Sequence, residues 1–244
     1  VDEINANGGL LGKKVEVIVE DTSGVPEKGI AAFERLASKE GVVAVTGEAH
    51  SAVCTAVGPL AKKYDIAFVA GECWADAVTG AKIPQVFRIT VANSLVYSIA
   101  ADWVKEVGFK NIAIIAENSD WGFGIIDVFT KNLKDTGAKV TSFTAERTVS
   151  DFTPQFLQLK RANPQPDLIV AGFTGSNLLL MLRQAYDLGI APSKATAIFA
   201  AGSDALEPEF WNVVGEGGVG VIANPAGLPG RPDTPLSRPS SKAF

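Results

Sequence analysis

Short runs that are β-rich or continuously apolar recur along this sequence and alternate with longer segments that have the periodicity of amphipathic helices. Residues 112–116, with the sequence IAIIA, are one such run. Runs that are apolar at every position are typical of strands covered on both faces, and strands that alternate with helices form mainly parallel sheets. The pattern therefore predicts an α/β protein, with strands at residues 15–19, 42–45, 66–70, 112–116, 168–171 and 197–201 and helices at residues 27–39, 52–64, 95–107, 125–136, 153–162 and 177–188.

An internal repeat divides this pattern into two similar halves. Gly12-Lys-Lys-Val15 is echoed by Gly137-Ala-Lys-Val140, and Gly47 is echoed by Gly172, 125 positions later (172 − 47 = 125). Each copy has the order helix, strand, helix, strand, glycine turn, helix. We therefore expect two similar, doubly wound, mainly parallel lobes joined by a hinge, with lobe one formed by residues 1–92 plus 223–244 and lobe two by residues 93–222.

The two copies differ at their beginnings. A strand and a turn, residues 111–124, precede the helix of the second copy, and the first copy has no counterpart to them. The first strand of a doubly wound sheet is normally central. We therefore expect a first strand to be missing from this sequence, and a C-terminal part to be missing after the Pro- and Gly-rich residues 224–238.

Composition and charge exclude several classes of function. The 27 acidic residues outnumber the 22 basic ones and give a formal net charge of −5, which disfavours nucleic acid as a partner because phosphate binding needs clustered positive charge. A hydrophobic content of 47% with 20% charged residues is that of a globular protein with a large core rather than of a disordered chain. No apolar run approaches the roughly 18 residues that cross a bilayer.

Signatures of catalysis and metal binding are weak. The single histidine, His50, adjoins Ser51, and neighbouring residues do not place their side chains as a base and a nucleophile. The sequence has no phosphate-binding loop, no nucleophile elbow and no complete dinucleotide fingerprint, since Gly122-Phe-Gly124 stops short. We therefore expect no catalytic residue, no metal site and no cofactor.

Two cysteines, Cys54 and Cys73, are too few for a disulfide framework and have no partners at zinc-binding spacing. Two interpretations remain. Free cysteines are often small core residues, and this favours two buried thiols. In an oxidising compartment the two could instead form a bridge.

The loops that follow the predicted strands are the candidate ligand site, because ligands of open parallel sheets collect beyond the carboxyl ends of strands. Ser51 and Ser176 stand where helix N-caps are expected. Each hydroxyl either caps its helix, which is worth about 1 kcal/mol, or faces a cleft and holds a ligand carboxylate. The loops concerned are residues 47–51, 71–74, 118–124, 172–176 and 202–204.

Two tryptophans occupy such loops in opposite halves. Trp74 and Trp121 could enclose a small organic ligand with two large amphipathic rings, or each could fill the core of its own lobe. Thr174, in the glycine loop of the second copy, could donate a hydroxyl. Trp103 and Trp211 lie in helical stretches, where we expect them to be packing residues.

In order and spacing, several segments together resemble the type I periplasmic binding proteins, specifically the leucine/isoleucine/valine-type solute-binding proteins of ABC importers. The resemblance runs from residue 1 to about residue 223. It rests on residues 1–15 (VDEINANGGLLGKKV), Glu20-Asp21 with residues 26–28, residues 45–47 with Ser51, residues 86–88 (VFR), residues 120–124 (DWGFG) and residues 182–185 (LRQA).

The resemblance implies ligand-binding residues in lobe one. The family's carboxylate-binding serine falls on Ser51, and the next ligand loop falls on Glu72, Cys73 and Trp74, with a backbone contact from Glu72. Amino-acid binders usually carry a small hydroxyl residue where this chain has Trp74. Trp74 by itself therefore argues against an ordinary α-amino acid as the ligand.

The resemblance also implies residues in lobe two and a function. The aromatic that covers the ligand falls on Trp121, a second contact on Thr174, and Asp204 is the carboxylate available for an α-ammonium group. The implied protein is not an enzyme. It is a periplasmic or extracytoplasmic receptor that captures a small amino-acid-like, carboxylate or amide ligand between two lobes and delivers it to an ABC transporter permease.

Two alternatives stay open on the sequence. The same fold serves as the ligand-sensing domain of receptors and transcriptional regulators, and a fused membrane or DNA-binding segment would distinguish these from a transport protein. The second alternative is an α/β enzyme, which turnover of a ligand by the purified protein would reveal.

Overall fold

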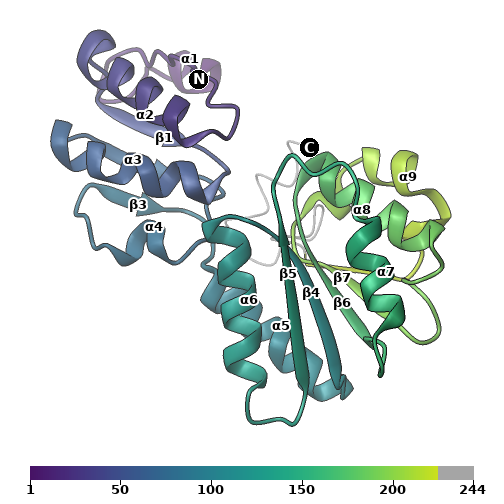
Figure 1. The fold of residues 1–244 in the computed structure, drawn as a ribbon. Coiled ribbons are helices and arrows are strands. Elements are labelled where there is room, and N and C mark those ends of the chain that lie inside the picture. Colours follow the sequence, from purple (N-terminus) through teal and green to yellow (C-terminus); the bar gives the residue numbers. More distant parts are fainter. Residues whose placement is uncertain (225–244) are drawn as a thin grey trace. The chain divides into compact units, whose positions relative to one another are not determined.

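The computed structural model describes residues 1–224, which form two compact units divided after Thr90 (Figure 1). Unit 1 is residues 1–90, and unit 2 begins at Val91. Each unit contains a parallel sheet with helices packed against it, so the predicted α/β class with mainly parallel sheets is confirmed. The predicted membership of residues 223–244 in lobe one stays a prediction, and residues 225–244 lie outside the described residues.

Unit 1 has a three-stranded sheet in the order β1-β2-β3, with all neighbours parallel. The strands are β1 (Ala44–Gly47), β2 (Ala67–Ala70) and β3 (Val86–Arg88), and the helices are α1 (Asp2–Ala6), α2 (Pro26–Arg35), its π-helical continuation η1 (Leu36–Glu40), α3 (Ser51–Tyr64) and α4 (Ala77–Gly80). Helix α3 forms because Val53, Val57 and Ala61 recur at a spacing of four, which buries one face of the helix. That face packs with Phe33 and Phe68 in the core of unit 1.

Unit 2 has a five-stranded parallel sheet in the order β5-β4-β6-β7-β8. Its strands are β4 (Asn111–Glu117), β5 (Lys139–Ala145), β6 (Leu168–Gly172), β7 (Ala197–Ala200) and β8 (Val221–Ala223). Its helices are α5 (Asn93–Val107), α6 (Asp120–Leu133), α7 (Thr153–Arg161), α8 (Gly175–Asp187) and α9 (Glu209–Val214), with short 3-10 turns η2 (Asp204–Leu206) and η3 (Gly215–Gly218). Figure 1 shows α5 and α6 on one side of this sheet and α7 and α8 on the other. Strand β4 is buried from Ile112 to its end because its neighbours and these helices cover it.

Four of the predicted strands form within one or two residues of the expected positions, and they become β2, β4, β6 and β7. The run predicted at 42–45 forms two residues later, as β1. Strands β3, β5 and β8 were not among the strands predicted from apolar runs, although the repeat implied a strand after Gly137. Strand β5, with the sequence KVTSFTA, lies at an edge and buries none of its residues fully, so it lacks the continuous apolarity that a doubly covered strand shows.

The strand predicted at residues 15–19 is wrong. These residues have no strand pairing, and within residues 1–224 the backbone groups of residues 16–21 take part in no hydrogen bond. A strand exists only where a neighbouring strand satisfies its backbone N–H and C=O groups. No described strand pairs with this segment.

The predicted N-caps are also wrong. Helix α3 begins at Ser51 itself, with His50 at the N-cap position, and α8 begins at Gly175, with Thr174 at the N-cap position. Neither Ser51 nor Ser176 therefore caps its helix, because each lies inside the first turn.

Of the two tryptophans expected to pack, Trp103 is half-buried, with ring contacts to Phe109 and Phe199. Trp211 differs from the expectation, because 59% of it is exposed on the short helix α9, with its ring edge-on to Phe210. Within residues 1–224, no helix combines the length and the apolarity needed to span a bilayer.

Candidate functional site

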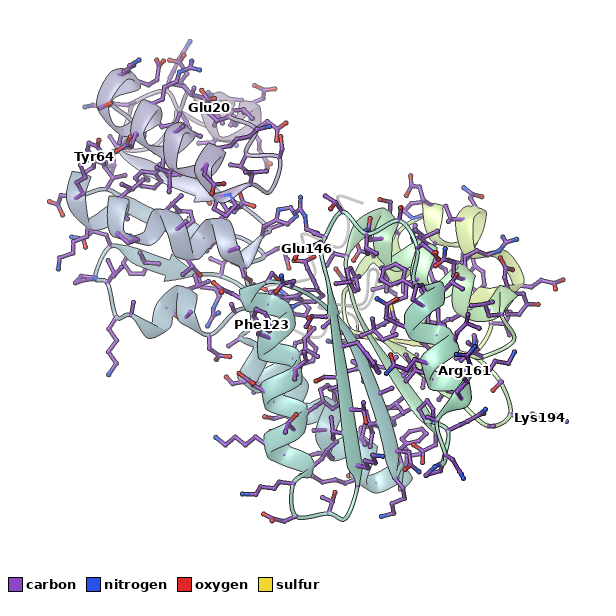
Figure 2. All side chains as sticks on the ribbon, in the orientation of Figure 1. Glu20, Tyr64, Phe123, Glu146, Arg161 and Lys194 are labelled. Carbon is purple, nitrogen blue, oxygen red and sulfur yellow. A yellow bond between two sulfur atoms is a disulfide. The ribbon has the colours of Figure 1, made fainter. Side chains whose placement is uncertain are left out.

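The expected ligand residues lie in two clusters, one in each unit, at the carboxyl ends of adjacent parallel strands. The unit 1 cluster, which contains Ser51, Glu72, Cys73 and Trp74, follows β1 and β2. The unit 2 cluster, which contains Trp121, Thr174 and Asp204, follows β4, β6 and β7. Figure 2 shows the side chains of both units on the ribbon.

Ser51 is a buried hydroxyl at the first position of α3. It is 4% exposed, and its Oγ accepts a hydrogen bond from the backbone N–H of Ala75 at 3.0 Å. A hydroxyl can accept and donate at the same time. No acceptor for the Ser51 hydroxyl proton is found among residues 1–224, so the group retains a donor at the N-terminus of a 14-residue helix. That end of a helix favours an anion.

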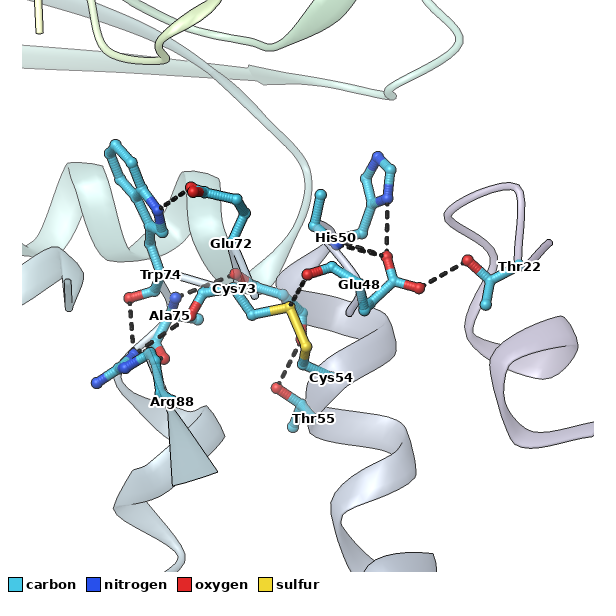
Figure 3. The surroundings of a disulfide bond; sticks show 12 residues. Thr22, Glu48, His50, Cys54, Thr55, Glu72, Cys73, Trp74, Ala75 and Arg88 are labelled. Atoms are coloured by element: carbon cyan, nitrogen blue, oxygen red, sulfur yellow. Dashed lines mark hydrogen bonds and ion pairs between the residues drawn. A yellow bond between two sulfur atoms is a disulfide. The ribbon is translucent and has the colours of Figure 1, made fainter. Parts of the chain in front are cut away.

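A disulfide bond joins Cys54 on α3 to Cys73 in the loop after β2 (Figure 3). The preferred expectation of two free thiols is therefore wrong. Cys54 lies one turn into α3, where it faces the loop, and the two Cα atoms are 6.4 Å apart, within the range that a bridge spans. The bond fixes the candidate ligand loop to the helix that carries Ser51.

Two further side chains hold the same loop. Trp74 is buried, and its Nε1 donates to Glu72 Oε2 at 3.0 Å. Arg88, at the end of β3, donates to the backbone carbonyl of Ala75 at 3.0 Å (Figure 3). It also donates to Thr79 Oγ1 at 3.1 Å. Arg88 also lies 3.4 Å from the carbonyls of Cys73 and Trp74. The guanidinium thus gathers three loop carbonyls on one side, a role that the sequence reasoning did not assign to Arg88.

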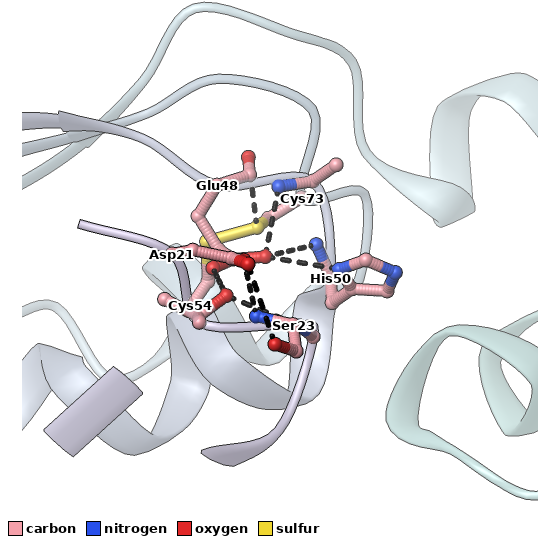
Figure 4. A network of polar contacts seen from close by, with 9 residues as sticks. Asp21, Ser23, Glu48, His50, Cys54 and Cys73 are labelled. Carbon is pink, nitrogen blue, oxygen red and sulfur yellow. Dashed lines mark hydrogen bonds and ion pairs between the residues drawn. A yellow bond between two sulfur atoms is a disulfide. The ribbon is translucent and has the colours of Figure 1, made fainter. Parts of the chain in front are cut away.

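Glu48 organises a polar network at the end of β1 (Figures 3 and 4). Its carboxylate accepts hydrogen bonds from the Thr22 hydroxyl at 2.7 Å, from the His50 backbone N–H at 2.8 Å and from the Ala49 backbone N–H at 3.0 Å. The His50 Nδ1 atom lies 3.1 Å away. Burial alone would raise the pKa of Glu48, but these hydrogen bonds outweigh it and lower the pKa from 4.5 to about 2.

The backbone of Glu48 is also constrained. Its φ is +68°, in the left-handed region, which few residues other than glycine adopt. Its carbonyl accepts from the Glu72 backbone N–H at 3.0 Å, so the network also holds the start of the ligand loop. Sequence reasoning missed Glu48, and the signal that could have found it is an acidic residue directly after the strand-ending Gly47.

In unit 2, the sequence DWGFG places Trp121 at the start of α6. The Ser119 hydroxyl caps this helix by accepting from the Gly122 N–H at 3.3 Å. A Cβ at Gly122 would overlap the carbonyl oxygen of Glu117, and a Cβ at Gly124 would overlap the side-chain amide of Asn93. The two glycines therefore allow the close approach that sets the position of Trp121, which is 8% exposed.

Thr174 and Asp204 lie together at the ends of β6 and β7. The Asp204 Oδ1 atom accepts from the Gly175 N–H at 2.7 Å and so joins the two loops. A Cβ at Gly202, between them, would come within 2.9 Å of the Asp204 carboxylate and 3.3 Å of Thr174 Cγ2. Thr174 makes no side-chain cap, so its hydroxyl is not committed to the N-terminus of α8.

A buried tyrosine supports the adjoining backbone. The Tyr97 hydroxyl donates to the Ala201 carbonyl at 3.1 Å, just before the loop that carries Asp204. Burial raises the pKa of Tyr97 far above its usual value, so the hydroxyl stays a neutral donor.

Glu117, the last residue of β4, is a further candidate that sequence reasoning missed. It is 6% exposed, and its Oε2 atom is buried with no hydrogen-bond partner among residues 1–224. A buried oxygen without a partner is costly, which makes this position, four residues before Trp121 in the chain, notable. Among the described residues, no group of three or more His, Cys, Asp or Glu side chains is placed to hold a metal ion.

Comparisons with known proteins identify the family of the chain. The model of the family described as periplasmic binding protein matches residues 1–238. A Leu/Ile/Val-binding protein, BraC3 of Rhizobium johnstonii, is 26% identical over 224 residues, and the match covers 91% of this chain and 59% of the relative.

Solved structures share the fold. The leucine binding protein LivK of Thermotoga maritima has a TM-score of 0.87 at 24% identity, covering 98% of this chain and 67% of that one. A solute binding protein of an ABC transporter from Rhodopseudomonas palustris, in complex with 3,4-dihydroxybenzoic acid, has a TM-score of 0.77 at 19% identity, covering 88% of this chain and 58% of that one.

This chain thus spans about 59% of the length of the curated relative. The match of the family model over residues 1–238, together with the parallel α/β units, shows that the chain belongs to the periplasmic binding protein family, in the type I form of the Leu/Ile/Val-binding proteins.

Proposed function

We propose that this protein is an extracytoplasmic solute-binding protein that captures a small organic carboxylate, amide or amino-acid-like molecule and presents it to the permease of an ABC importer. Binding, rather than chemistry, is its activity. The ligand engages the unit 1 cluster and the unit 2 cluster together, and this double engagement favours a closed form over an open one. The chain segments near residues 90–94 and 220–224 act as the hinge.

The observation that carries this proposal is the environment of Ser51. A buried hydroxyl at a helix N-terminus, with a free donor and a neighbouring loop that is fixed by a disulfide, suits a ligand carboxylate. Trp121 is the covering aromatic ring, Thr174 supplies a second hydroxyl, and Asp204 is the acceptor for any ligand ammonium group. Glu72 and Cys73 contribute backbone groups.

Trp74 favours a planar ligand over a branched-chain amino acid. A large ring replaces the small hydroxyl residue that amino-acid binders carry, so this side of the site offers an apolar face in place of a hydrogen-bond donor. The Rhodopseudomonas palustris protein of the same fold is complexed with a hydroxylated benzoic acid. An aromatic carboxylate is therefore the first class of ligand to test.

Titration calorimetry tests the proposal with benzoate, 4-hydroxybenzoate, leucine and isoleucine on the full chain. We expect Trp121→Ala to weaken ligand binding about 5- to 150-fold, since removing a covering aromatic ring costs about 1–3 kcal/mol. Trp211→Ala, which removes an exposed tryptophan from α9, is the matched control and should leave affinity unchanged. Equal affinity of the two variants would defeat the site assignment.

Ser51→Ala tests the carboxylate contact separately. It should weaken a carboxylate ligand but leave the corresponding amide or alcohol less affected, because the charge-assisted hydrogen bond is lost only with the anion. The same loss for both ligands would assign Ser51 a purely structural role.

A further inference from the structure

Arg88, the last residue of β3, holds its guanidinium against the loop of the unit 1 cluster. Its backbone pairs with the last residue of β2, directly before that loop. The Nη2 atom donates to Thr79 Oγ1 at 3.1 Å. The Nη1 atom faces three successive loop carbonyls, with oxygens at 3.0 Å in Ala75 and at 3.4 Å in Cys73 and Trp74 (Figure 3). The strand and Thr79 therefore fix the charged group in place.

The guanidinium of Arg88 has no carboxylate partner in the part of the chain that the structure describes. The ion pairs within residues 1–224 all join other residues. The hydrogen-bond partners of Arg88 are carbonyls and a hydroxyl, which carry no net charge. Because Arg88 is partly buried, its positive charge costs free energy unless an anion compensates it. An anion bound nearby would supply this compensation.

One peptide group connects Arg88 to Ser51. The peptide bond between Trp74 and Ala75 is not among the cis bonds of the described chain, so its carbonyl oxygen and its N–H point in opposite directions. The carbonyl oxygen, which belongs to Trp74, faces Arg88. The N–H, which belongs to Ala75, donates to Ser51 Oγ at 3.0 Å. Arg88 and Ser51 therefore contact opposite sides of the same amide.

A cation at the carbonyl side of an amide strengthens the donor on its other side. The positive charge draws electron density towards the carbonyl oxygen and away from the N–H, and hydrogen bonds in series reinforce one another. The Ser51 oxygen accepts from this N–H and can donate its own proton to a further acceptor. The charge of Arg88 thus acts at the Ser51 hydroxyl without a direct contact between the two side chains.

We propose that Arg88 is the positioning residue that makes the Ser51 site selective for an anion, so that a carboxylate is preferred to the amide of the same shape. Arg88 acts on the ligand through the peptide group between Trp74 and Ala75 and through Ser51. The inference rests on the proposed function in one respect, namely that a polar group of the ligand meets Ser51. It adds the charge of that group and the residue that selects it.

Substitutions separate this role from a purely structural one. An arginine that only ties the loop together would support every ligand alike, because a looser loop weakens carboxylate and amide equally. A residue that selects for charge changes the ratio of the two affinities. Arg88→Lys keeps the charge and loses the planar fork, whereas Arg88→Gln keeps a neutral donor and loses the charge. Ala75→Pro keeps Arg88 and removes the N–H that reaches Ser51.

Benzoate and benzamide are matched probes, since they differ in charge and little in shape. Titration calorimetry on the full chain measures both dissociation constants for the parent and each variant. Arg35→Gln is the control for net charge, because within residues 1–224 the Arg35 side chain bonds to Glu20 and Glu40. We expect Arg88→Gln and Ala75→Pro to lower the preference for benzoate about fivefold or more, and Arg88→Lys and Arg35→Gln to change it less than about twofold.

Amide hydrogen exchange in the solute-free protein gives a second measurement. Exchange at Ala75 reports its hydrogen bond to Ser51, and Glu72, whose N–H bonds to the Glu48 carbonyl at 3.0 Å, is the internal reference within the same loop. We expect Arg88→Gln to speed exchange at Ala75 about fivefold or more relative to Glu72. Arg88→Lys should stay close to the parent.

Three results would overturn the proposal. They are an equal loss of benzoate and benzamide affinity in both Arg88→Gln and Ala75→Pro, an Ala75 amide that Arg88→Gln leaves unchanged, and a loss of preference in Arg88→Lys as large as in Arg88→Gln. Binding of neither probe to the parent would count against the proposed ligand class instead. Exchange at Ala75 then decides the role of Arg88: faster exchange in Arg88→Gln alone supports it, and equal exchange in parent, Arg88→Lys and Arg88→Gln overturns it.

Discussion

The side-chain amide of Asn93 donates a hydrogen bond to the backbone carbonyl of Trp121 at 2.9 Å, so the first residue of α5 is tied to the first turn of α6. Asn93 is fully buried, and Gly124 leaves room for its amide because a Cβ there would overlap it. The position of the aromatic ring in the unit 2 cluster thus depends on a residue 28 positions earlier in the chain.

Asn93→Ala should lower the free energy of unfolding of unit 2 by about 1–3 kcal/mol, because it removes a buried hydrogen bond and leaves space behind it. Urea denaturation followed by tryptophan fluorescence measures the change. Asn132→Ala is the control, since within residues 1–224 the Asn132 amide bonds to the Val128 carbonyl of the same helix and is partly exposed. An equal loss of unfolding free energy in both variants would show that the hydrogen bond between Asn93 and Trp121 does not stabilise unit 2 more than an ordinary bond within a helix does.

Loss of the bridge between Cys54 and Cys73 should destabilise unit 1 and free its ligand loop. The double variant Cys54→Ser/Cys73→Ser is expected to lose about 2–4 kcal/mol, typical of a bridge that closes a loop of this length. Thermal unfolding with and without dithiothreitol measures it. The reductant should lower the midpoint of the parent protein and leave the double variant unaffected, whereas an equal response in both would contradict the bridge.

Stability should fall at low pH through Glu48. The folded-state pKa of this carboxyl is lowered to about 2, against an ordinary value of 4.5. Its stabilising contribution is therefore fully present above about pH 4.5 and is lost as the pH falls towards 2. The thermal midpoint of Glu48→Gln should vary less between pH 4.5 and 2 than that of the parent. Glu106→Gln, at an exposed position whose side chain makes no hydrogen bond within residues 1–224, should follow the parent. Parallel curves for all three proteins would rule out this role.

Gly122→Ala should be strongly destabilising, by about 3 kcal/mol or more, because the new Cβ would overlap the Glu117 carbonyl oxygen and force the backbone to move. Gly80→Ala is the matched control. Gly80 ends the short helix α4, is exposed and has no atom within 4 Å of an added Cβ, so its replacement should change stability by less than about 1 kcal/mol. Urea midpoints compare the two, and equal midpoints would show that the close approach at Gly122 is not needed.

The elements that the sequence predicts well are those whose burial produces a pattern within a short run of residues. Residues 112–116 are apolar throughout because helices cover both faces of β4. This one short run is therefore enough to predict a buried strand. Strand β5 was not found as an apolar run because it lies at an edge and mixes apolar with polar residues. Residues 15–19 have a strand's composition but no partner in the described chain, and composition alone does not supply one.

The location of the candidate site was predictable from the sequence, but the contacts between its residues were not. The rule that ligands collect at strand ends locates Ser51, Trp74 and Trp121, since it needs only the strand positions. The hydrogen bond from Thr22 to Glu48 and the bridge from Cys54 to Cys73 join residues 26 and 19 positions apart. Such pairings depend on how helices and loops face one another in space, which no local pattern records.

The bridge at Cys73 has a consequence for how the protein matures. The loop that carries Glu72 and Trp74 is cross-linked through the residue between them. Cytosolic reductants would keep these two thiols reduced. In a newly made chain, the loop would then be held by Arg88 and hydrogen bonds alone. Full stiffening of the loop would then come only after the chain meets an oxidant.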